Sequence, residues 1–132
     1  MALTQEEMVE RLLAVTDAFN RGDFDAAVEI AHPEVVFVRP GGQSEVMGVA
    51  ALRAWMEPDA FESMVGELLE FERDGNKLLA RLRTRARGAG SGIEMEIESW
   101  SVWTFDEDGR ITRMAFFLPH EEAEARQALQ SN

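Results

Sequence analysis

The spacing of apolar residues changes along the chain from intervals of three or four to strict alternation. Met8, Leu12, Val15 and Phe19 lie on one face of a 3.6-residue repeat, which predicts an amphipathic helix over residues 5–19. Beyond Pro58 the period becomes two, which is typical of strands. The pattern therefore predicts a helical first part followed by a strand-rich second part.

Polar residues mark where the helices begin and end. Thr4, three residues before Glu7, forms a capping-box pattern at the start of the first helix. Gly22 ends that helix because glycine adopts a left-handed conformation without strain. Asp23 then caps a second helix over residues 24–31, which is expected to end before Pro33. These signals predict a helical hairpin at the start of the chain.

Apolar runs and turn residues define the remaining elements. The run from Val35 to Val38 predicts a buried strand that Pro40, Gly41 and Gly42 close. A short helix over residues 49–56 follows Gly48. We expect four further strands and a last helix, at residues 63–73, 77–87, 93–105 and 110–118 and at residues 121–130.

The second and third of these strands carry opposite charges on one face. Alternation places Arg81, Arg83, Arg85 and Arg87 on that face, and Glu94, Glu96 and Glu98 on the matching face of the next strand. Oppositely charged cross-strand neighbours stabilise a sheet, so we interpret the arginines as a solvated face rather than as an anion site.

The same alternation continues into residues 99–103. It turns Ser99, Ser101 and Trp103 inward and Trp100 and Val102 outward. Two large apolar groups on an otherwise charged face suggest a subunit interface. We therefore predict a homodimer that pairs through Trp100 and Val102.

The composition narrows the class of protein. A chain of 132 residues that is 45% hydrophobic and 29% charged suits a single domain over residues 1–132. It has no apolar run long enough for a membrane span and no basic leader, so we expect a cytoplasmic protein without membrane contact. A net charge of -12 makes nucleic acid an unsuitable partner.

The inventory of reactive side chains is short. Without Cys there is no thiolate nucleophile or Cys-ligated metal, and without Tyr only His32, His120 and the carboxylates remain for ordinary acid–base chemistry. The two histidines share no ligand spacing, and the acidic turn at residues 106–109 is too short for a calcium loop. We expect neither a metal nor a cofactor.

Helices first and an antiparallel meander afterwards indicate an α+β fold. Within it the stretches "FNRGDFDAAVEIAHPEVVF", "GVAALRAWM" and "VWTFDEDGRITRMAFFL" resemble the SnoaL-like (polyketide-cyclase-like) branch of the nuclear transport factor 2-like superfamily, which also contains the ketosteroid-isomerase-like proteins. The resemblance implies a cone-shaped barrel. Its curved, mostly antiparallel sheet wraps around a long N-terminal helix, with two further short helices and a C-terminal helix. Such cones enclose a pocket, but they serve enzymes and binding domains alike.

The resemblance argues against two of the superfamily's chemistries. Where ketosteroid isomerases carry their base, Tyr and oxyanion Asp, this chain has Arg39, Val15 and Ser101. Arg cannot abstract a proton near neutral pH. The inward strand positions also lack the carboxylates that limonene-epoxide hydrolases use. The last strand, residues 112–118, lacks the acidic residue of SnoaL-type cyclases, and His120 is the nearest titratable group.

What the resemblance implies instead is an apolar pocket with few polar contacts. Its apolar lining would comprise Val15, Phe19, Phe37, Trp55, Met56, Trp103, Met114 and Phe116, and its polar contacts Arg39, Ser99 and Ser101. His32 is either a corner residue or a polar contact, and His120 is either an exposed residue at a helix start or a polar contact. The same apolar residues would also serve to fill a core.

Three functions are left open by these residues. The first is binding of a small apolar or amphipathic molecule, the second is a cyclase, isomerase or hydrolase of the same fold, and the third is an interaction domain whose cone is filled. Arg39 shares a strand face with Phe37 and would need a partner if buried: a carboxylate such as Glu67, Glu70 or Asp17, or an anionic group of the ligand.

Overall fold

The strands form one six-stranded sheet in the order β2-β1-β6-β5-β4-β3. The computed structural model describes residues 3–39, 45–57 and 61–130. All neighbouring strands are antiparallel except β1 and β6, which run parallel. The elements are α1 Gln5–Asn20, α2 Phe24–Ala27, β1 Ala31–Val38, β2 Glu45–Met47, α3 Val49–Met56, β3 Phe61–Asp74, β4 Lys77–Gly88, β5 Glu94–Phe105, β6 Ile111–Phe117 and α4 Glu122–Gln130.

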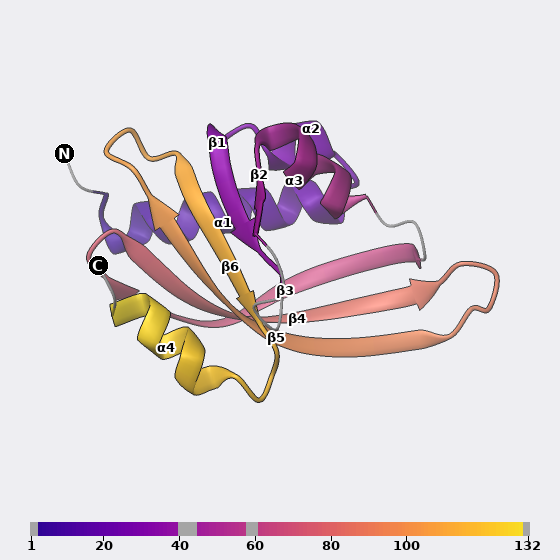
Figure 1. Ribbon diagram of the computed structural model, residues 1–132. Helices are drawn as coiled ribbons and strands as arrows, with labels where there is room; N and C mark the ends of the chain where they lie inside the picture. Colours follow the sequence, from indigo (N-terminus) through magenta and orange to yellow (C-terminus); the bar gives the residue numbers. More distant parts are fainter. Residues whose placement is uncertain (1–2, 40–44, 58–60, 131–132) are drawn as a thin grey trace.

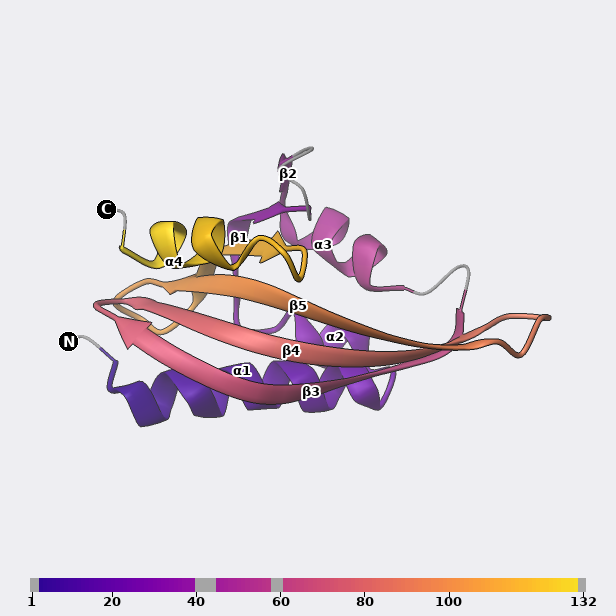
Figure 2. The ribbon, with the colours of Figure 1, turned by 90° about the horizontal axis from the view of Figure 1, so that it is seen from below.

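The sheet curves around α1 without closing on itself (Figure 1). Seen from below, α1 lies on one face of the sheet and α4 on the other (Figure 2). This confirms the predicted α+β cone with a curved, mostly antiparallel sheet, a long N-terminal helix and three further helices.

The helix starts are those predicted from the polar residues. Thr4 and Glu7 form the reciprocal capping box, with the Glu7 N–H donating to Thr4 Oγ1 at 3.1 Å and the Thr4 N–H donating to Glu7 Oε1 at 3.0 Å. Asp23 Oδ1 accepts from the Ala26 N–H at 3.1 Å. The capping pattern therefore predicted both starts correctly.

The junction between α2 and β1 differs from the prediction. α2 ends at Ala27 instead of residue 31, and β1 already begins at Ala31. Residue 31 is drawn into the sheet because it pairs with Ile111 of β6, while the Ile111 N–H donates to the Ile30 carbonyl at 2.9 Å. Pro33 then lies where the register shifts between Ala31 and Val36, an irregular site that tolerates a residue without an N–H. The three-residue strand β2 was not predicted.

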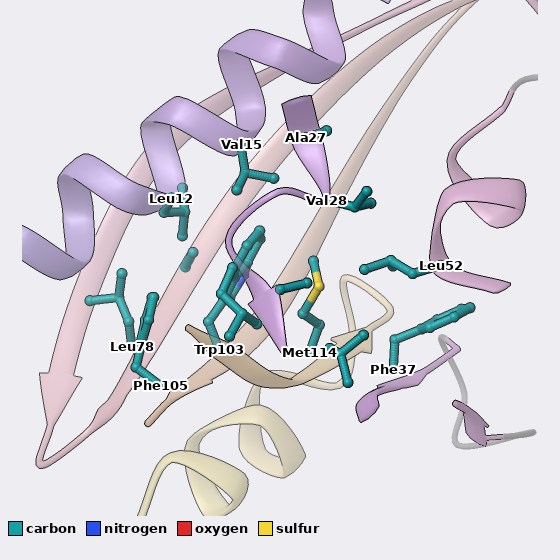
Figure 3. Packing of buried hydrophobic residues seen from close by; sticks show 14 of the residues in the cluster. Leu12, Val15, Ala27, Val28, Phe37, Leu52, Leu78, Trp103, Phe105 and Met114 are labelled. Atoms are coloured by element: carbon teal, nitrogen blue, oxygen red, sulfur yellow. The ribbon is translucent and has the colours of Figure 1, made fainter. Parts of the chain in front are cut away.

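The core lies between α1 and the concave face of the sheet. Leu12 and Val15 of α1 face Leu78 and Trp103 of the sheet, and all four side chains are buried (Figure 3). Phe37 and Met114 extend this cluster toward α3, where Leu52 is buried. Each such aliphatic side chain contributes roughly 1.5–3 kcal/mol on full burial.

The outer face of the sheet carries a second, smaller cluster under α4. Trp100 and Val102 face outward as predicted, but they are buried there with Leu79, Ala125 and Leu129. The premise of an exposed interface at Trp100 and Val102 was therefore wrong, because α4 of the same chain folds over them. Dimerisation itself stays a prediction without an assigned surface.

The arginine and glutamate ladders lie side by side beyond this cluster. Arg81 contacts Glu98 at 2.9 Å and Arg83 contacts Glu96 at 2.6 Å, with β3 supplying further carboxylates such as Glu70 at 3.5 Å from Arg81. This confirms the predicted cross-strand match. Because these side chains are about a third exposed or more, each pair contributes little, on the order of 0–1 kcal/mol.

A side chain of α1 covers the β3 edge of the sheet at Gly66. Asn20 Nδ2 donates to the Gly66 carbonyl at 2.9 Å, and the Gly66 N–H donates to Asn20 Oδ1 at 2.7 Å. A side-chain amide thus supplies the two hydrogen bonds that a neighbouring strand would otherwise make. The helix corner at residues 20–23 therefore also anchors α1 to the sheet edge.

We predict that Asn20→Ala lowers the free energy of unfolding by about 1–2 kcal/mol, because two net hydrogen bonds are lost. Urea denaturation of the variant and of Glu10→Ala, an exposed position on the same helix, provides the comparison. The control is expected to change by less than about 0.5 kcal/mol. Equal losses in both variants would contradict the anchoring role of Asn20.

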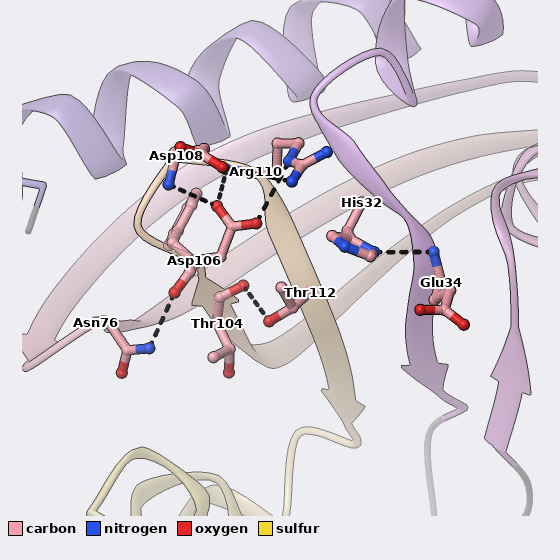
Figure 4. A network of polar contacts seen from close by, with 9 residues as sticks. His32, Glu34, Asn76, Thr104, Asp106, Asp108, Arg110 and Thr112 are labelled. Atoms are coloured by element: carbon pink, nitrogen blue, oxygen red, sulfur yellow. Dashed lines mark hydrogen bonds and ion pairs between the residues drawn. The ribbon is translucent and has the colours of Figure 1, made fainter.

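A polar network stabilises the turn between β5 and β6 (Figure 4). Asp106 Oδ1 accepts from the N–H groups of Asp108 and Arg110, each at 2.9 Å, and Arg110 Nε lies 3.4 Å from Asp106 Oδ2. Partial burial acts to raise the pKa of the Asp106 carboxyl, but these donors and the guanidinium together hold that pKa below its ordinary value.

We expect the Asp106 carboxylate to stabilise the fold in a pH-dependent way. Because its folded pKa is lowered, its contribution is present above the ordinary value of about 3.8 and is lost as the pH falls through the lower folded pKa. Thermal unfolding should therefore show Asp106→Asn less stable than wild type near neutral pH, with the difference shrinking as the pH falls below the ordinary carboxyl value. A difference that does not depend on pH would argue against the ionic contribution.

Candidate functional site

Three aromatic side chains from three elements meet at one end of the concave face. Trp55 of α3 lies between Phe37 of β1 and Phe116 of β6, with ring centroids 5.1 and 5.0 Å apart. Phe37 is fully buried, Phe116 is partly buried and Trp55 keeps 38% of its surface exposed. Rings at these separations attract one another, so the cluster holds an exposed indole in a fixed position.

The sheet continues this surface with smaller side chains. Ser101 of β5 pairs with Phe116 of β6, and the next inward position on β5, Ser99, pairs with Leu82 of β4. Ser99 and Leu82 are both partly buried. We call Phe37, Trp55, Leu82, Ser99 and Phe116 together the mouth.

Most of the other predicted lining residues pack inside the core. Val15, Met56, Trp103 and Met114 are all buried in the main cluster. Phe19 is partly buried and meets Phe24 edge-to-face, with ring centroids 5.9 Å apart. These residues therefore support the mouth from behind.

Ser101 has an internal role. Its side chain is fully buried, its Oγ accepts from the Trp103 indole Nε1–H at 2.8 Å, and it donates to the Ala80 carbonyl at 3.5 Å. A buried indole N–H needs an acceptor, and Ser101 supplies it. Ser99, two residues earlier on the same inward face of β5, is the serine that lies at the mouth.

Arg39 does not occupy a buried position. β1 ends at Val38, and Arg39 follows as an exposed residue, so the expected need for a buried carboxylate partner was wrong. No ion pair joins it to Glu67, Glu70 or Asp17 in the described part of the chain. An exposed guanidinium stays hydrated and needs no such partner.

Neither histidine belongs to the mouth. His32 lies near the start of β1, where its Nδ1 accepts the Glu34 N–H at 3.0 Å, which is a local corner contact (Figure 4). His120 is exposed in the turn before α4. The two residues are thus placed as corner and exposed positions rather than as polar contacts of a pocket.

The described concave face of β4 to β6 carries no ionisable side chain. Its inward residues alternate with the charged outer ones and are apolar, Ser or Thr: Leu78, Ala80, Leu82, Thr84, Ala86, Met95, Ile97, Ser99, Ser101, Trp103, Phe105, Met114 and Phe116. General acid–base catalysis needs a titratable group within hydrogen-bonding reach of the substrate. The described strands offer none on this face.

Two clefts lie on the opposite, outer face beside α4. They measure about 300 and 160 Å³ and share Glu70 and Trp100. Guanidinium groups already occupy positions near the indole, with Arg81 at 5.9 Å and Arg126 at 5.5 Å from the ring centroid. These spaces are thus bordered by ion pairs internal to the fold.

Comparison with known proteins places this chain in a family. The model of the SnoaL-like domain matches residues 9–114. The chain belongs to the SnoaL-like domain family. No curated protein sequence matches it.

Solved structures of SnoaL-like and related proteins share the fold. The epoxide hydrolase/cyclase-like enzyme SalBIII, described for a role in pyran ring formation in the polyether salinomycin, is 22% identical, with 86% of this chain and 91% of that chain covered and a TM-score of 0.78. TerC, co-crystallised with polyporic acid, is 21% identical, with 93% and 97% covered and a TM-score of 0.73. A protein from Sinorhizobium meliloti that is described provisionally as a polyketide cyclase is 29% identical. The match covers 81% of this chain and 93% of that chain, with a TM-score of 0.66.

Sequence reasoning missed some residues of this SnoaL-like domain's concave face. Leu82 and Ile97 were not among the predicted site residues, because the alternation gives the side of the sheet and not the distance from the mouth. Among the described residues, no helix is long and apolar enough to cross a membrane, and no three acidic or His side chains gather as a metal site.

We predict that Ser101→Ala costs about 1–3 kcal/mol of unfolding free energy, because the buried Trp103 indole N–H loses its acceptor. Ser99→Ala, a partly buried serine on the same face, is the matched control and should cost much less. Chemical denaturation followed by tryptophan fluorescence measures both. A larger loss in Ser99→Ala would show that the two serines have been given the wrong roles.

Proposed function

We propose that this SnoaL-like domain binds a small, largely apolar molecule at the mouth. The observation that carries the proposal is the exposed Trp55 ring, held between Phe37 and Phe116 at the end of a concave apolar face. An aromatic side chain that is rigid and still exposed offers contact area without a large entropy cost on binding.

The polarity of the described surface agrees with such a ligand. Ser99 is the one hydroxyl that the sheet register places at the mouth, next to Leu82 and Phe116. Ligand sites of this kind combine apolar walls with few orienting polar groups. A weakly polar molecule has few polar groups that need hydrogen bonds, so moving it from water to this site costs little free energy.

Relatives of this fold supply a precedent for a bound organic molecule. TerC was co-crystallised with polyporic acid. At 21% identity that comparison shows the fold alone, and we carry over only the idea that a cone of this shape accommodates an organic ligand. That the ligand of this chain is small and largely apolar is part of the proposal.

A catalytic role is the second candidate. The 29% identical protein from Sinorhizobium meliloti, which is described provisionally as a polyketide cyclase, favours it, since it covers 81% of this chain. The described concave face opposes it, because its residues include no general acid or base. We therefore favour binding over acid–base catalysis.

We predict that Trp55→Ala weakens binding of Nile red, a neutral planar dye, by about tenfold or more, because the central contact surface of the mouth is removed. The measurement is a fluorescence titration of the purified protein. Leu13→Ala, which removes a comparably exposed apolar side chain from the solvent face of α1, is the control and should leave the affinity unchanged.

A second readout needs no variant. Of the three tryptophans, Trp100 and Trp103 are buried and Trp55 is exposed, so acrylamide quenching reports mainly on Trp55. A ligand at the mouth should reduce that quenching. Dye binding that neither protects Trp55 nor depends on it would overturn the proposal.

A further inference from the structure

β4 and β5, with β3 beside β4, extend beyond the strands β6, β1 and β2. Residues 84–98, which we call the arm, project past the helices in both views (Figures 1 and 2). β6 pairs with β5 only from Trp100 onward, so Glu94 to Ser99 pair with β4 alone. This stretch of β5 is thus an edge that no other described strand covers.

On the opposite edge of the same sheet, which β3 forms, a side chain covers the backbone at one position. There the Asn20 amide takes up both the N–H and the carbonyl of Gly66. No comparable side-chain pair meets the backbone of residues 94–99 in the described part of the chain. An open strand edge presents unpaired donors and acceptors that can pair with an added strand.

The side chains of this edge differ between its two sides. On the inner side Ile93, Met95 and Ile97 remain 64%, 40% and 44% exposed. On the outer side Glu94, Glu96 and Glu98 alternate with them. A strand laid against this edge would therefore meet apolar groups on one face and carboxylates on the other.

This pattern disfavours a second copy of the chain as the occupant. In antiparallel pairing, directly opposite residues point to the same side of the sheet, so the outer glutamates of two copies would oppose one another. The β3 edge of another copy is covered by Asn20 at Gly66 and carries Glu67 on its outer side. Like charges across strands are destabilising.

The same pattern favours a basic partner. Within the chain the outer glutamates already match the arginines of β4, with Arg83 2.6 Å from Glu96. A strand with cationic residues at alternate positions would repeat this arrangement on the free side of β5, and its apolar residues would cover Met95 and Ile97.

We propose that residues 93–99 of β5 form a docking edge for an extended peptide segment in which basic and apolar residues alternate. The segment adds a strand to the sheet through backbone hydrogen bonds. Its cations face the glutamates, and its apolar side chains lie on the inner side of the arm. Ser99 is the one residue that this edge shares with the mouth, and the aromatic residues of the mouth lie outside the edge.

The test is a titration of the isotope-labelled full chain with a capped hexapeptide of alternating lysine and valine, followed by NMR. We expect amide shifts concentrated at residues 93–99 and an affinity that falls as salt is added. A peptide of the same composition with its lysines and valines in separate blocks is the control, and it should bind at least about tenfold more weakly.

Variants then separate the edge from general attraction to an acidic protein. Ile97→Lys should weaken binding by about tenfold or more, and Met95→Lys serves as a second variant if the first unfolds. Val65→Lys, at an apolar position on β3 that is 49% exposed, adds the same charge away from this edge and should change affinity little.

Several outcomes would overturn the proposal. Equal binding of the alternating and block peptides would mean charge attraction alone, and shifts confined to the mouth would mean that the valines occupy the ligand site. Absence of shifts at millimolar peptide would remove the docking edge. If the wild-type protein sediments as a dimer and the Ile97→Lys variant sediments as a monomer, the edge binds a second copy of the chain instead of a peptide.

Discussion

The packing of α1 against the concave face of the sheet is the constraint on which the rest of this SnoaL-like domain depends. Leu12 and Val15 bury their side chains against Leu78 and Trp103, and this apolar contact sets which face of every strand is inward. Asn20 then ties the end of the same helix to the backbone of Gly66. At one end of the same face, Trp55 lies between two buried or partly buried rings.

Unequal strand lengths explain why β4 and β5 project beyond β6 and the helices. β4 and β5 contain 12 residues each, while β6 contains 7. The residues of β5 beyond the reach of β6 have one strand neighbour fewer, and their inner side chains Met95 and Ile97 stay exposed. The charged outer face keeps this projecting part hydrated. The exposed inner face and the open edge therefore arise from the same difference in length.

The sequence was a good guide to elements whose signals are local. The capping residues Thr4 and Asp23, the alternation from residue 77 to residue 105 and the turn at residues 106–109 each depend on neighbours within a few positions, and all appear in the structure. The candidate site was less predictable. Phe37, Trp55 and Phe116 were expected at the pocket, but the buried role of Ser101 and the exposure of Arg39 were not.

The amino-acid sequence by itself determined the fold family, the side of the sheet to which each strand residue points, and the acidic, cysteine-free character of the surface. These properties follow from spacing, capping chemistry and composition, which act over short distances along the chain. Tertiary structure alone decided how deep each inward residue lies, that β1 begins at Ala31, and that α4 covers Trp100 and Val102. Those outcomes arise from contacts between residues far apart in the sequence, and such contacts are fixed only when whole elements compete to bury apolar surface and to satisfy backbone groups.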